Sequence, residues 1–421
     1  MKFDQFKLKS STCGLFFILV IIFCFKPSFT AANINGFYFP DKNWDVTIPE
    51  QQGMDSKLIS KLYTYIKEES LDIQSVLITR NGYLIEEKFL HSYEIIEGDQ
   101  FHSDDSFWTG LLIPVENIRY NRLHALWSCT KSITSLLIGI AIDEGYFNIT
   151  QTFFDIFPDR WKSSYGDEIK KNITVEHLLT MRAGLLWQEE VDSFFGWPAT
   201  DFSMDYILNK PMTKLGESFI YSTGDTQLLS AILQNKTGSK ASEFAREKLF
   251  APIGIEDTEW EWDETNWEWG SGNISFGGFG LFMTPRAMAR IGLLCLNNGT
   301  WKDRQIVPKE WIKTATSNLV GNPAYGYLFW LSEYFYSAMG FLGQRIIIIS
   351  EFSIVIVFTA GEINDIDDNY EDIVNNYILD INGSDTDTSS NGTSDVEMLP
   401  LLAAVVVLAS IYKYKRNKKV N

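Results

Sequence analysis

The feature that most constrains the fold of this chain is a helical segment, Ser128 to Glu144, that is apolar on nearly every side beyond its first turn. A helix of this kind must be surrounded by other elements, because it has no face suited to water. Gly145 is well placed to end it. The opening of the segment, Ser128-Cys129-Thr130-Lys131, therefore places a hydroxyl and an amine at the mouth of a buried helix.

This pair of side chains suits nucleophilic catalysis. Residues three apart share a helix face, so the Lys131 amine can reach the Ser128 hydroxyl. A serine hydroxyl is a poor nucleophile until a base takes its proton, and burial at a helix N-terminus lowers the pKa of a lysine. The spacing alone is weak evidence, because it recurs at Ser410–Lys413 in an apolar tail segment. The alternative is an N-capping serine beside a solvated lysine.

Strand patterns lie at both ends of the central region. Asn81-Gly82 predicts a hairpin turn between two β-rich runs, and helical patterns dominate from about 155 to 273. The strand patterns are Ser75–Phe89, Ala324–Leu331, Gln344–Ile349 and Ile354–Thr359. We therefore expect one α+β domain over 33–383, with an antiparallel sheet formed by both ends, flanking helices and a mostly helical subdomain.

Several stretches, in order, resemble one family. Residues from about Gly53 to Ile381 are similar to the serine β-lactamase and penicillin-binding-protein-like hydrolases, in the class C-like branch with esterases and aminohexanoate-dimer hydrolases. The resemblance implies a β-lactamase/transpeptidase-like fold and serine hydrolase activity. The matching stretches are Ser128–Lys131, Ile173–Trp187, Phe219–Gly238, Leu249–Trp260, Gly277–Leu294 and Tyr336–Ile349.

By that resemblance, Tyr221 of the second motif, Tyr221-Ser222-Thr223, moves protons between Ser128, the leaving group and the incoming water. The alternative is a core aromatic whose hydroxyl happens to meet a partner. Thr223 occupies a place where the family often has Asn, and its hydroxyl can bond Lys131 or the substrate.

The third motif departs from the penicillin-recognising pattern. The matching stretch is Ala338-Met339-Gly340, with no cation to grip a substrate carboxylate. Gly340 would let the strand backbone approach the substrate, and the N–H groups of Ser128 and Phe341 would form the oxyanion hole. This favours an uncharged ester or amide. The alternative is that Arg345 supplies the cation.

We expect Trp187, Thr223, Ala338, Gly340 and Phe341 to contact the substrate, with Trp187 and Phe341 lining an apolar acyl pocket. No cofactor or metal is expected, because ligands are not clustered. A serine–histidine–aspartate site is disfavoured, since no G-x-S-x-G elbow is present and the histidines are unsuited. Two other functions stay open: a β-lactamase or D,D-peptidase, and a catalytically inactive surface binding module.

The two ends carry membrane signals. A basic start, an apolar run and small residues predict a secretory signal over 1–32, or an uncleaved anchor. A polar stalk over 384–397 precedes an apolar segment, 398–412, and a basic tail, 413–421. We expect that segment to cross the lipid bilayer, with the hydrolase domain outside the cell. The alternative is a buried terminal element.

Net charge limits the classes of binding partner, and the cysteine count limits the disulfides that the domain can form. The formal net charge is −18, and the basic ends hide a still more acidic central domain. Such a surface repels nucleic acid, which excludes that class of partner. Of four cysteines, Cys13 and Cys24 lie in the predicted signal, so Cys129 and Cys295 form no disulfide framework.

Overall fold

The computed structural model describes residues 37–90, 122–166, 168–265, 273–321, 323–361 and 369–379. The predicted signal (1–32), stalk (384–397), membrane segment (398–412) and basic tail (413–421) lie outside these residues, so they stay predictions. Within the described ranges, none of the helices combines the length and the apolar character needed to cross a bilayer.

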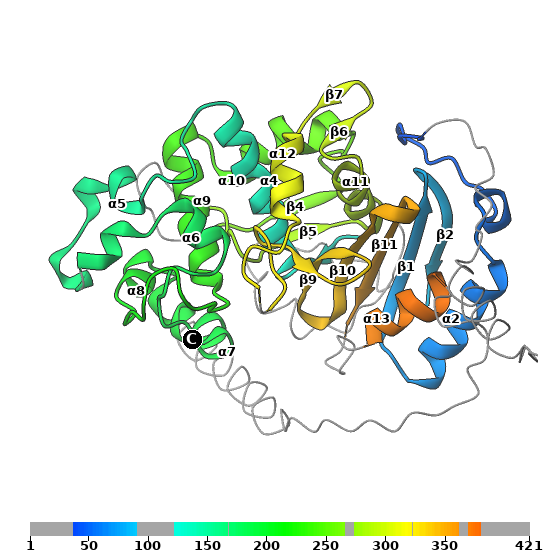
Figure 1. Cartoon of the computed structure of the whole chain (residues 1–421), viewed down its shortest axis with the longest axis horizontal. Helices are drawn as coiled ribbons and strands as arrows, with labels where there is room; N and C mark the ends of the chain where they lie inside the picture. Colours follow the sequence, from blue (N-terminus) through cyan, green and yellow to red (C-terminus); the bar gives the residue numbers. More distant parts are fainter. Residues whose placement is uncertain are drawn as a thin grey trace, which may run out of the picture.

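A six-stranded sheet forms one half of the molecule, and every neighbouring pair is antiparallel (Figure 1). Its order is β2-β1-β11-β10-β9-β8. The N-terminal hairpin pairs with the last strand, with Leu77 opposite Val357, so both ends of the domain close the sheet. This confirms the α+β prediction. The strands are β1 (Ile73–Arg80), β2 (Tyr83–Phe89), β8 (Trp330–Leu331), β9 (Tyr336–Gly340), β10 (Gln344–Ile349) and β11 (Ile354–Ala360).

The predicted hairpin turn is present at Asn81-Gly82. Both residues have positive φ, 52° and 85°, as a two-residue turn that follows the twist of its strands requires. Glycine is also needed for space at position 82, because a Cβ there would lie 1.7 Å from the Tyr38 carbonyl oxygen. The local sequence therefore fixes the register of β1 against β2.

Both faces of the sheet are covered, which explains why β11 is buried at every position and apolar at every position except Thr359. On one face, Ile347 and Phe358 share a core with helices α2 (Ser56–Glu68) and α13 (Asn369–Ile373). On the other face, the core is shared with α4 (Cys129–Asp143) and α11 (Pro285–Leu296).

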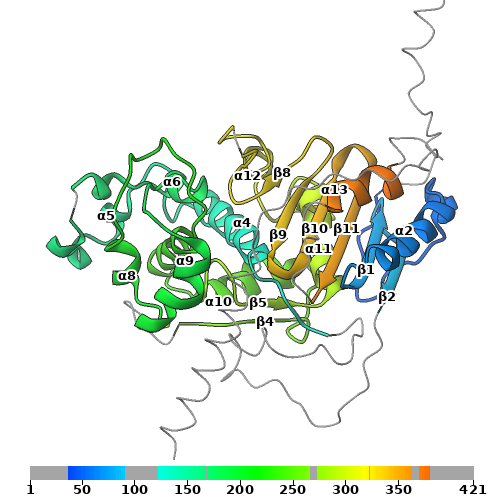
Figure 2. The same ribbon diagram turned by 90° about the horizontal axis from the view of Figure 1, so that it is seen from below.

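A mostly helical region adjoins the α4 side of the sheet, as Figures 1 and 2 show. Short elements connect it to the sheet: β3 (His124–Ala125), β4 (Trp260–Trp262) and β5 (Leu281–Met283) form a small sheet, and β6 (Thr300–Trp301) pairs with β7 (Arg304–Gln305). The remaining α-helices of the described residues are α5 (Phe153–Ile156), α6 (Val175–Leu179), α7 (Glu189–Val191), α8 (Met204–Leu208), α9 (Thr223–Thr237), α10 (Ala241–Ala245) and α12 (Lys309–Ala315), and short 3-10 and π turns lie between them.

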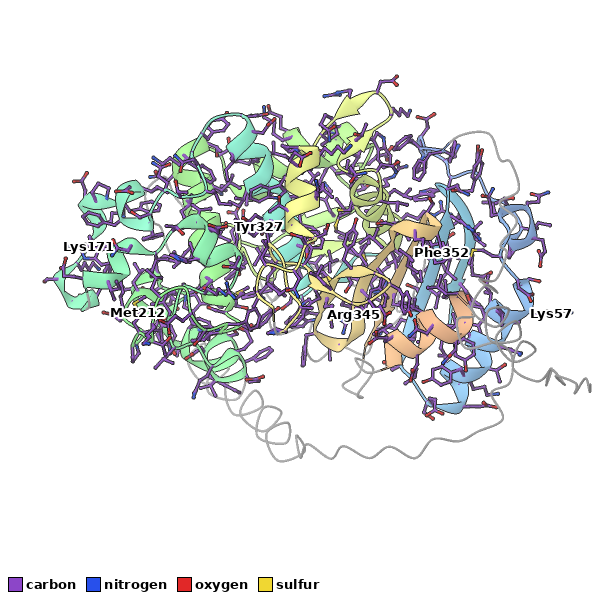
Figure 3. The ribbon with its side chains drawn as sticks, in the orientation of Figure 1. Lys57, Lys171, Met212, Tyr327, Arg345 and Phe352 are labelled. Carbon is purple, nitrogen blue, oxygen red and sulfur yellow. The ribbon has the colours of Figure 1, made fainter. Side chains whose placement is uncertain are left out.

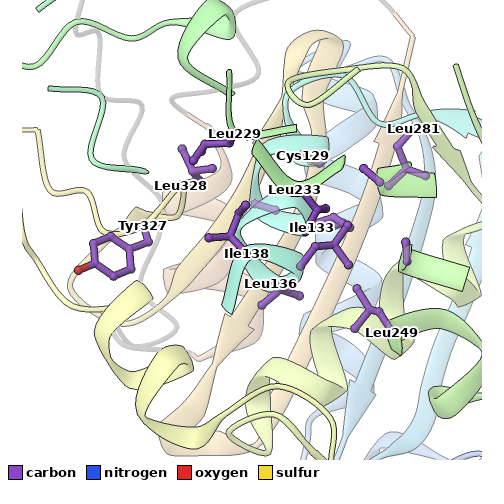
Figure 4. Close-up of a cluster of buried hydrophobic side chains, with 14 of the residues drawn as sticks. Cys129, Ile133, Leu136, Ile138, Leu229, Leu233, Leu249, Leu281, Tyr327 and Leu328 are labelled. Atoms are coloured by element: carbon purple, nitrogen blue, oxygen red, sulfur yellow. The ribbon is translucent and has the colours of Figure 1, made fainter. Parts of the chain in front are cut away.

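Helix α4 lies at the centre of the larger core, as its composition predicted. Every residue from Cys129 to Ala141 is buried. Side chains from several elements surround it, including Leu229 and Leu233 of α9 (Figure 4). The approach is close at Gly139, where a Cβ would lie 2.5 Å from the Trp311 ring. Helix α4 is therefore closely packed along its length.

One predicted strand is much shorter in the structure. The aromatic run Ala324–Leu331 contributes only Trp330–Leu331 to the sheet, because the chain turns at Leu328, where φ is 62°. The Leu328 carbonyl accepts a hydrogen bond from the Ser132 hydroxyl at 2.6 Å. The run is thus a buried loop against α4, and packing rather than strand pairing accounts for its apolar composition.

Candidate active site

Ser128 stands immediately before α4, at the end of a tight turn. Trp127 has a φ of 49°, a left-handed conformation that costs a non-glycine residue about 1–2 kcal/mol. Packing holds it there: the Trp127 ring is buried and meets the Phe341 ring edge-on, 5.6 Å between centroids. Ser128 is partly exposed, whereas the residues on either side are buried. The turn therefore presents one hydroxyl at the helix mouth.

Lys131 lies directly beneath that hydroxyl and is 1% exposed. Its Nζ donates to Ser128 Oγ at 2.9 Å, to Thr223 Oγ1 at 2.8 Å and to the Gly278 carbonyl at 3.0 Å. Burial lowers the pKa of Lys131 from 10.5 to about 8, although the Glu189 carboxylate opposes this shift. The amine is thus both adjacent to Ser128 and readily deprotonated.

Tyr221 completes the group, and the hydroxyls of Tyr221 and Ser128 are close enough to hydrogen-bond. Its ring centroid is 4.8 Å from Lys131 Nζ. Burial, followed by the negative charge of Glu189, raises the pKa of Tyr221 far above its usual value. Tyr221 is therefore a neutral phenol at ordinary pH, suited to relaying a proton but not to serving as the resting base. The structure brings the three predicted catalytic side chains together.

Thr223 is the first residue of α9, after the N-cap Ser222, whose hydroxyl accepts from the Asp225 N–H at 3.0 Å. The Thr223 hydroxyl accepts from Lys131 and donates in turn to Glu189 Oε1. Of the two partners expected for this hydroxyl, the structure shows Lys131, and the hydroxyl also joins that lysine to a carboxylate. The contact of Thr223 with substrate stays a prediction.

Glu189, in α7, was not found from the sequence. Its Oε2 accepts from the Thr223 N–H at 2.9 Å and from Trp187 Nε1 at 2.8 Å, and its Oε1 lies 3.9 Å from Lys131 Nζ. The only signal available was the pair Glu189-Glu190 directly after the family-like stretch that ends at Trp187. Nothing local distinguishes these two glutamates, since only the fold brings Glu189 to α9.

Trp187 and Phe341 differ from each other in position. Trp187 is 5% exposed and packs on α9, where a Cβ at Gly224 would lie 2.9 Å from its ring. The structure therefore places Trp187 in the core, where it holds Glu189, rather than on an open wall of an acyl pocket. Phe341 is partly exposed and lies between Trp127 and Phe194, whose ring centroid is 5.7 Å away.

The end of β9 lies against the turn that carries Ser128. A Cβ at Gly340 would be 2.2 Å from the Leu126 carbonyl oxygen and 3.2 Å from Cys129 Sγ, so only glycine allows this approach. Ala338, two residues earlier, lies on the same face and is buried. The end of β9 thus packs against the turn that carries Ser128. The N–H groups of Ser128 and Phe341 stay the predicted oxyanion donors.

Arg345, which Figure 3 labels, alternates with Ile346 of the α4-facing core, so its side chain lies on the other face of the sheet. It is opposite Met339 in the β9–β10 register, and its guanidinium stands 4.9 Å above the Tyr370 ring. Nη1 donates to the carbonyls of Gly340 and Gln344, at 2.9 and 2.8 Å. The alternative that Arg345 replaces the missing cation is wrong, because the strand alternation directs its side chain away from α4.

The pair Gly277-Gly278 lies close to both α4 and α9. A Cβ at Gly277 would lie 2.1 Å from the Thr226 carbonyl oxygen, and one at Gly278 would lie 2.4 Å from Thr226 Oγ1. This close packing brings the Gly278 carbonyl to Lys131. In the part of the chain that the structure describes, no three acidic, histidine or cysteine side chains gather in a way that could hold a metal ion.

Comparisons with known proteins agree with this fold. A family model described as Beta-lactamase matches residues 113–362. A protein from Bacillus anthracis named as a 6-aminohexanoate-dimer hydrolase is 17% identical, with a TM-score of 0.59 over 83% of this chain and 90% of its own. FmtA from Staphylococcus aureus is 16% identical, with a TM-score of 0.56 over 85% and 96%.

A penicillin binding protein from Bacillus halodurans is also similar, at 15% identity and a TM-score of 0.55 over 74% of this chain and 98% of its own. No curated protein sequence matches the chain significantly. At these identities the structural likeness establishes the fold and leaves the substrate open.

Proposed function

This chain belongs to the beta-lactamase family, whose members are serine hydrolases in the main, and on that premise we propose that it cleaves uncharged esters or amides through an acyl-enzyme on Ser128. The observation that carries the proposal is the 2.9 Å contact between Ser128 Oγ and the buried amine of Lys131. A buried amine with a lowered pKa next to a partly exposed hydroxyl is the arrangement that an activated serine needs.

In the acylation step, Ser128 Oγ attacks the substrate carbonyl carbon and its proton passes to neutral Lys131 Nζ. The N–H groups of Ser128 and Phe341 hold the oxyanion of the tetrahedral intermediate. The intermediate then collapses and the bond to the leaving group breaks. Tyr221 gives its proton to that group and takes one from Lys131, which restores the neutral amine.

In deacylation, water is the nucleophile, Ser128 is the leaving group, and the protons move in the opposite direction. Water attacks the acyl carbon and loses a proton through Tyr221 to Lys131. The ester bond to Ser128 breaks, the proton returns to Ser128 Oγ, and the free acid departs. Each proton therefore moves within the cluster of Ser128, Lys131 and Tyr221, and no cofactor is needed.

The preference for an uncharged substrate rests on β9. Ala338 occupies the position at which penicillin-recognising relatives present a cation, and Arg345 lies on the opposite face of the sheet. Around the serine, the partly exposed ring of Phe341 packs with Phe194 and Trp127, and Tyr221 packs with Trp330. An apolar acyl group would fit these surroundings better than a carboxylate.

The test combines a fluorophosphonate probe with a panel of p-nitrophenyl esters. We expect one adduct per chain by intact mass, ester turnover, and loss of both in Ser128→Ala. Ser164→Ala, at an exposed serine, is the matched control and should behave as wild type. No adduct and no turnover in the folded wild type would favour an inactive binding module.

The β-lactamase or D,D-peptidase alternative is favoured by the name of one similar protein, the penicillin binding protein from Bacillus halodurans. Nitrocefin turnover separates the two activities. Hydrolysis of nitrocefin faster than of neutral esters would show that the missing cation does not exclude β-lactams. For the site of action, we propose the outer face of a membrane, with the domain tethered through 398–412. Protease accessibility on intact cells tests that location.

A further inference from the structure

The hydrogen bonds around Lys131 determine where its lone pair points. Nζ has three neighbours: Ser128 Oγ, Thr223 Oγ1 and the Gly278 carbonyl. The carbonyl can only accept. The Thr223 hydroxyl has a single hydrogen, which it gives to Glu189 Oε1, so towards Lys131 it also can only accept. Two N–H groups of Nζ are thereby assigned, and the third tetrahedral position faces Ser128.

In the neutral amine that third position is the lone pair, which is what a base for Ser128 requires. The arrangement depends on Glu189 taking the hydrogen of Thr223. Without that acceptor, the Thr223 hydroxyl could turn and donate to the lone pair, in competition with Ser128.

We propose that Glu189 is a positioning residue that turns the Thr223 hydroxyl away from Lys131 and so directs the amine at Ser128, and that its negative charge sets the pH range of acylation. The inference rests on the proposed function, because it concerns the same acylation step. Glu189 would act through Thr223 and Lys131, without itself touching the reacting atoms.

The charge of Glu189 is close to Lys131, at 3.9 Å between Oε1 and Nζ, and favours the ammonium. Burial raises the pKa of Tyr221 and Tyr325 further above 10, so both phenols are neutral near pH 7, and burial also raises the pKa of Asp225 well above its usual value. The other titratable groups nearby are the Cys129 thiol and Arg345, which lies across the sheet.

Glu189→Gln is the sharpest test, because the amide keeps the shape and reverses one contact. Two N–H donors, from Thr223 and Trp187, converge on Oε2, so the amide oxygen should take that place. The amide NH2 then faces Thr223 Oγ1 and donates to it. That turns the Thr223 hydroxyl towards Lys131.

The measurement is the rate of fluorophosphonate labelling across pH 5.5 to 10, for full-length wild type and variants in detergent. For Glu189→Gln we expect the midpoint of the acid limb about one pH unit lower, because a nearby positive–negative interaction is lost. We expect the plateau at high pH to be roughly tenfold slower, because the amine is misdirected. Glu190→Gln removes a carboxylate from the exposed neighbour and should match wild type.

Two further variants separate the effect of the Glu189 charge on the midpoint from the effect of the Thr223 hydroxyl on the plateau. Thr223→Val removes the hydroxyl but keeps the charge of Glu189, so its plateau should fall while its midpoint moves downward by less than that of Glu189→Gln. Glu189→Asp keeps the charge and should restore the wild-type midpoint. If a melting curve shows Glu189→Gln misfolded, these two variants carry the test.

Glu189→Gln with an unchanged midpoint and plateau would overturn the inference, and so would an unchanged plateau in Thr223→Val. Absence of labelling in the wild type at every pH is a different result. It would overturn the proposed function itself.

Discussion

The most direct prediction concerns pH. The proposed base is neutral Lys131, so the rate of Ser128 acylation should follow the fraction of that lysine which is deprotonated. A lysine in water has a pKa of 10.5, and burial brings that of Lys131 to about 8. The perturbation to apply is therefore a change of pH across this value.

The fraction of Lys131 that is neutral at each pH follows from its lowered pKa. With a pKa of about 8, Lys131 is neutral in roughly 1% of molecules at pH 6, 9% at pH 7 and half at pH 8. An ordinary lysine would be neutral in only about 0.03% of molecules at pH 7. Burial therefore supplies about 300 times more base at neutral pH, which corresponds to about 3 kcal/mol.

The assay is the rate of labelling by a fluorophosphonate at constant ionic strength, with Lys131→Ala as the control. The logarithm of the rate should rise by one unit per pH unit below 8 and level off above it. Tyr221 should add no second limb below pH 10, because its pKa is raised far above the usual value. A flat profile from pH 6 to 9, or a midpoint near 10.5, would refute the assignment of Lys131 as the base.

Two further predictions concern β9. Gly340→Ala would place a Cβ 2.2 Å from the Leu126 carbonyl oxygen, so we expect the end of β9 to move away from the turn that carries Ser128. Ester turnover should then fall at least about tenfold. Turnover equal to that of the wild type, in a variant that circular dichroism shows to be folded, would contradict this. Ala338→Lys should add a cation on the α4 face and raise the ratio of nitrocefin to p-nitrophenyl acetate turnover, whereas Met339→Lys, on the opposite face, should leave the ratio unchanged. The same rise in both lysine variants would mean that net charge, and not position, is responsible.

Several parts of the molecule could be predicted from the sequence because they depend on local patterns. The apolar surroundings of Ser128–Glu144 require a buried helix, and Ser128 with Lys131 falls on one of its faces whatever packs around it. Asn81-Gly82 fixes a hairpin for the same kind of reason. Strand patterns at both ends were enough to predict a sheet that the termini close.

What only the tertiary structure decided are the contacts between distant residues. Lys131 meets Thr223 across 92 positions of sequence and Gly278 across 147, so no periodicity could have revealed either contact or the link to Glu189. Strand register, which a one-residue change reverses, decided that Arg345 faces away from α4. Local sequence determines which side chains an element offers, whereas close packing of elements far apart in the chain decides which of them meet.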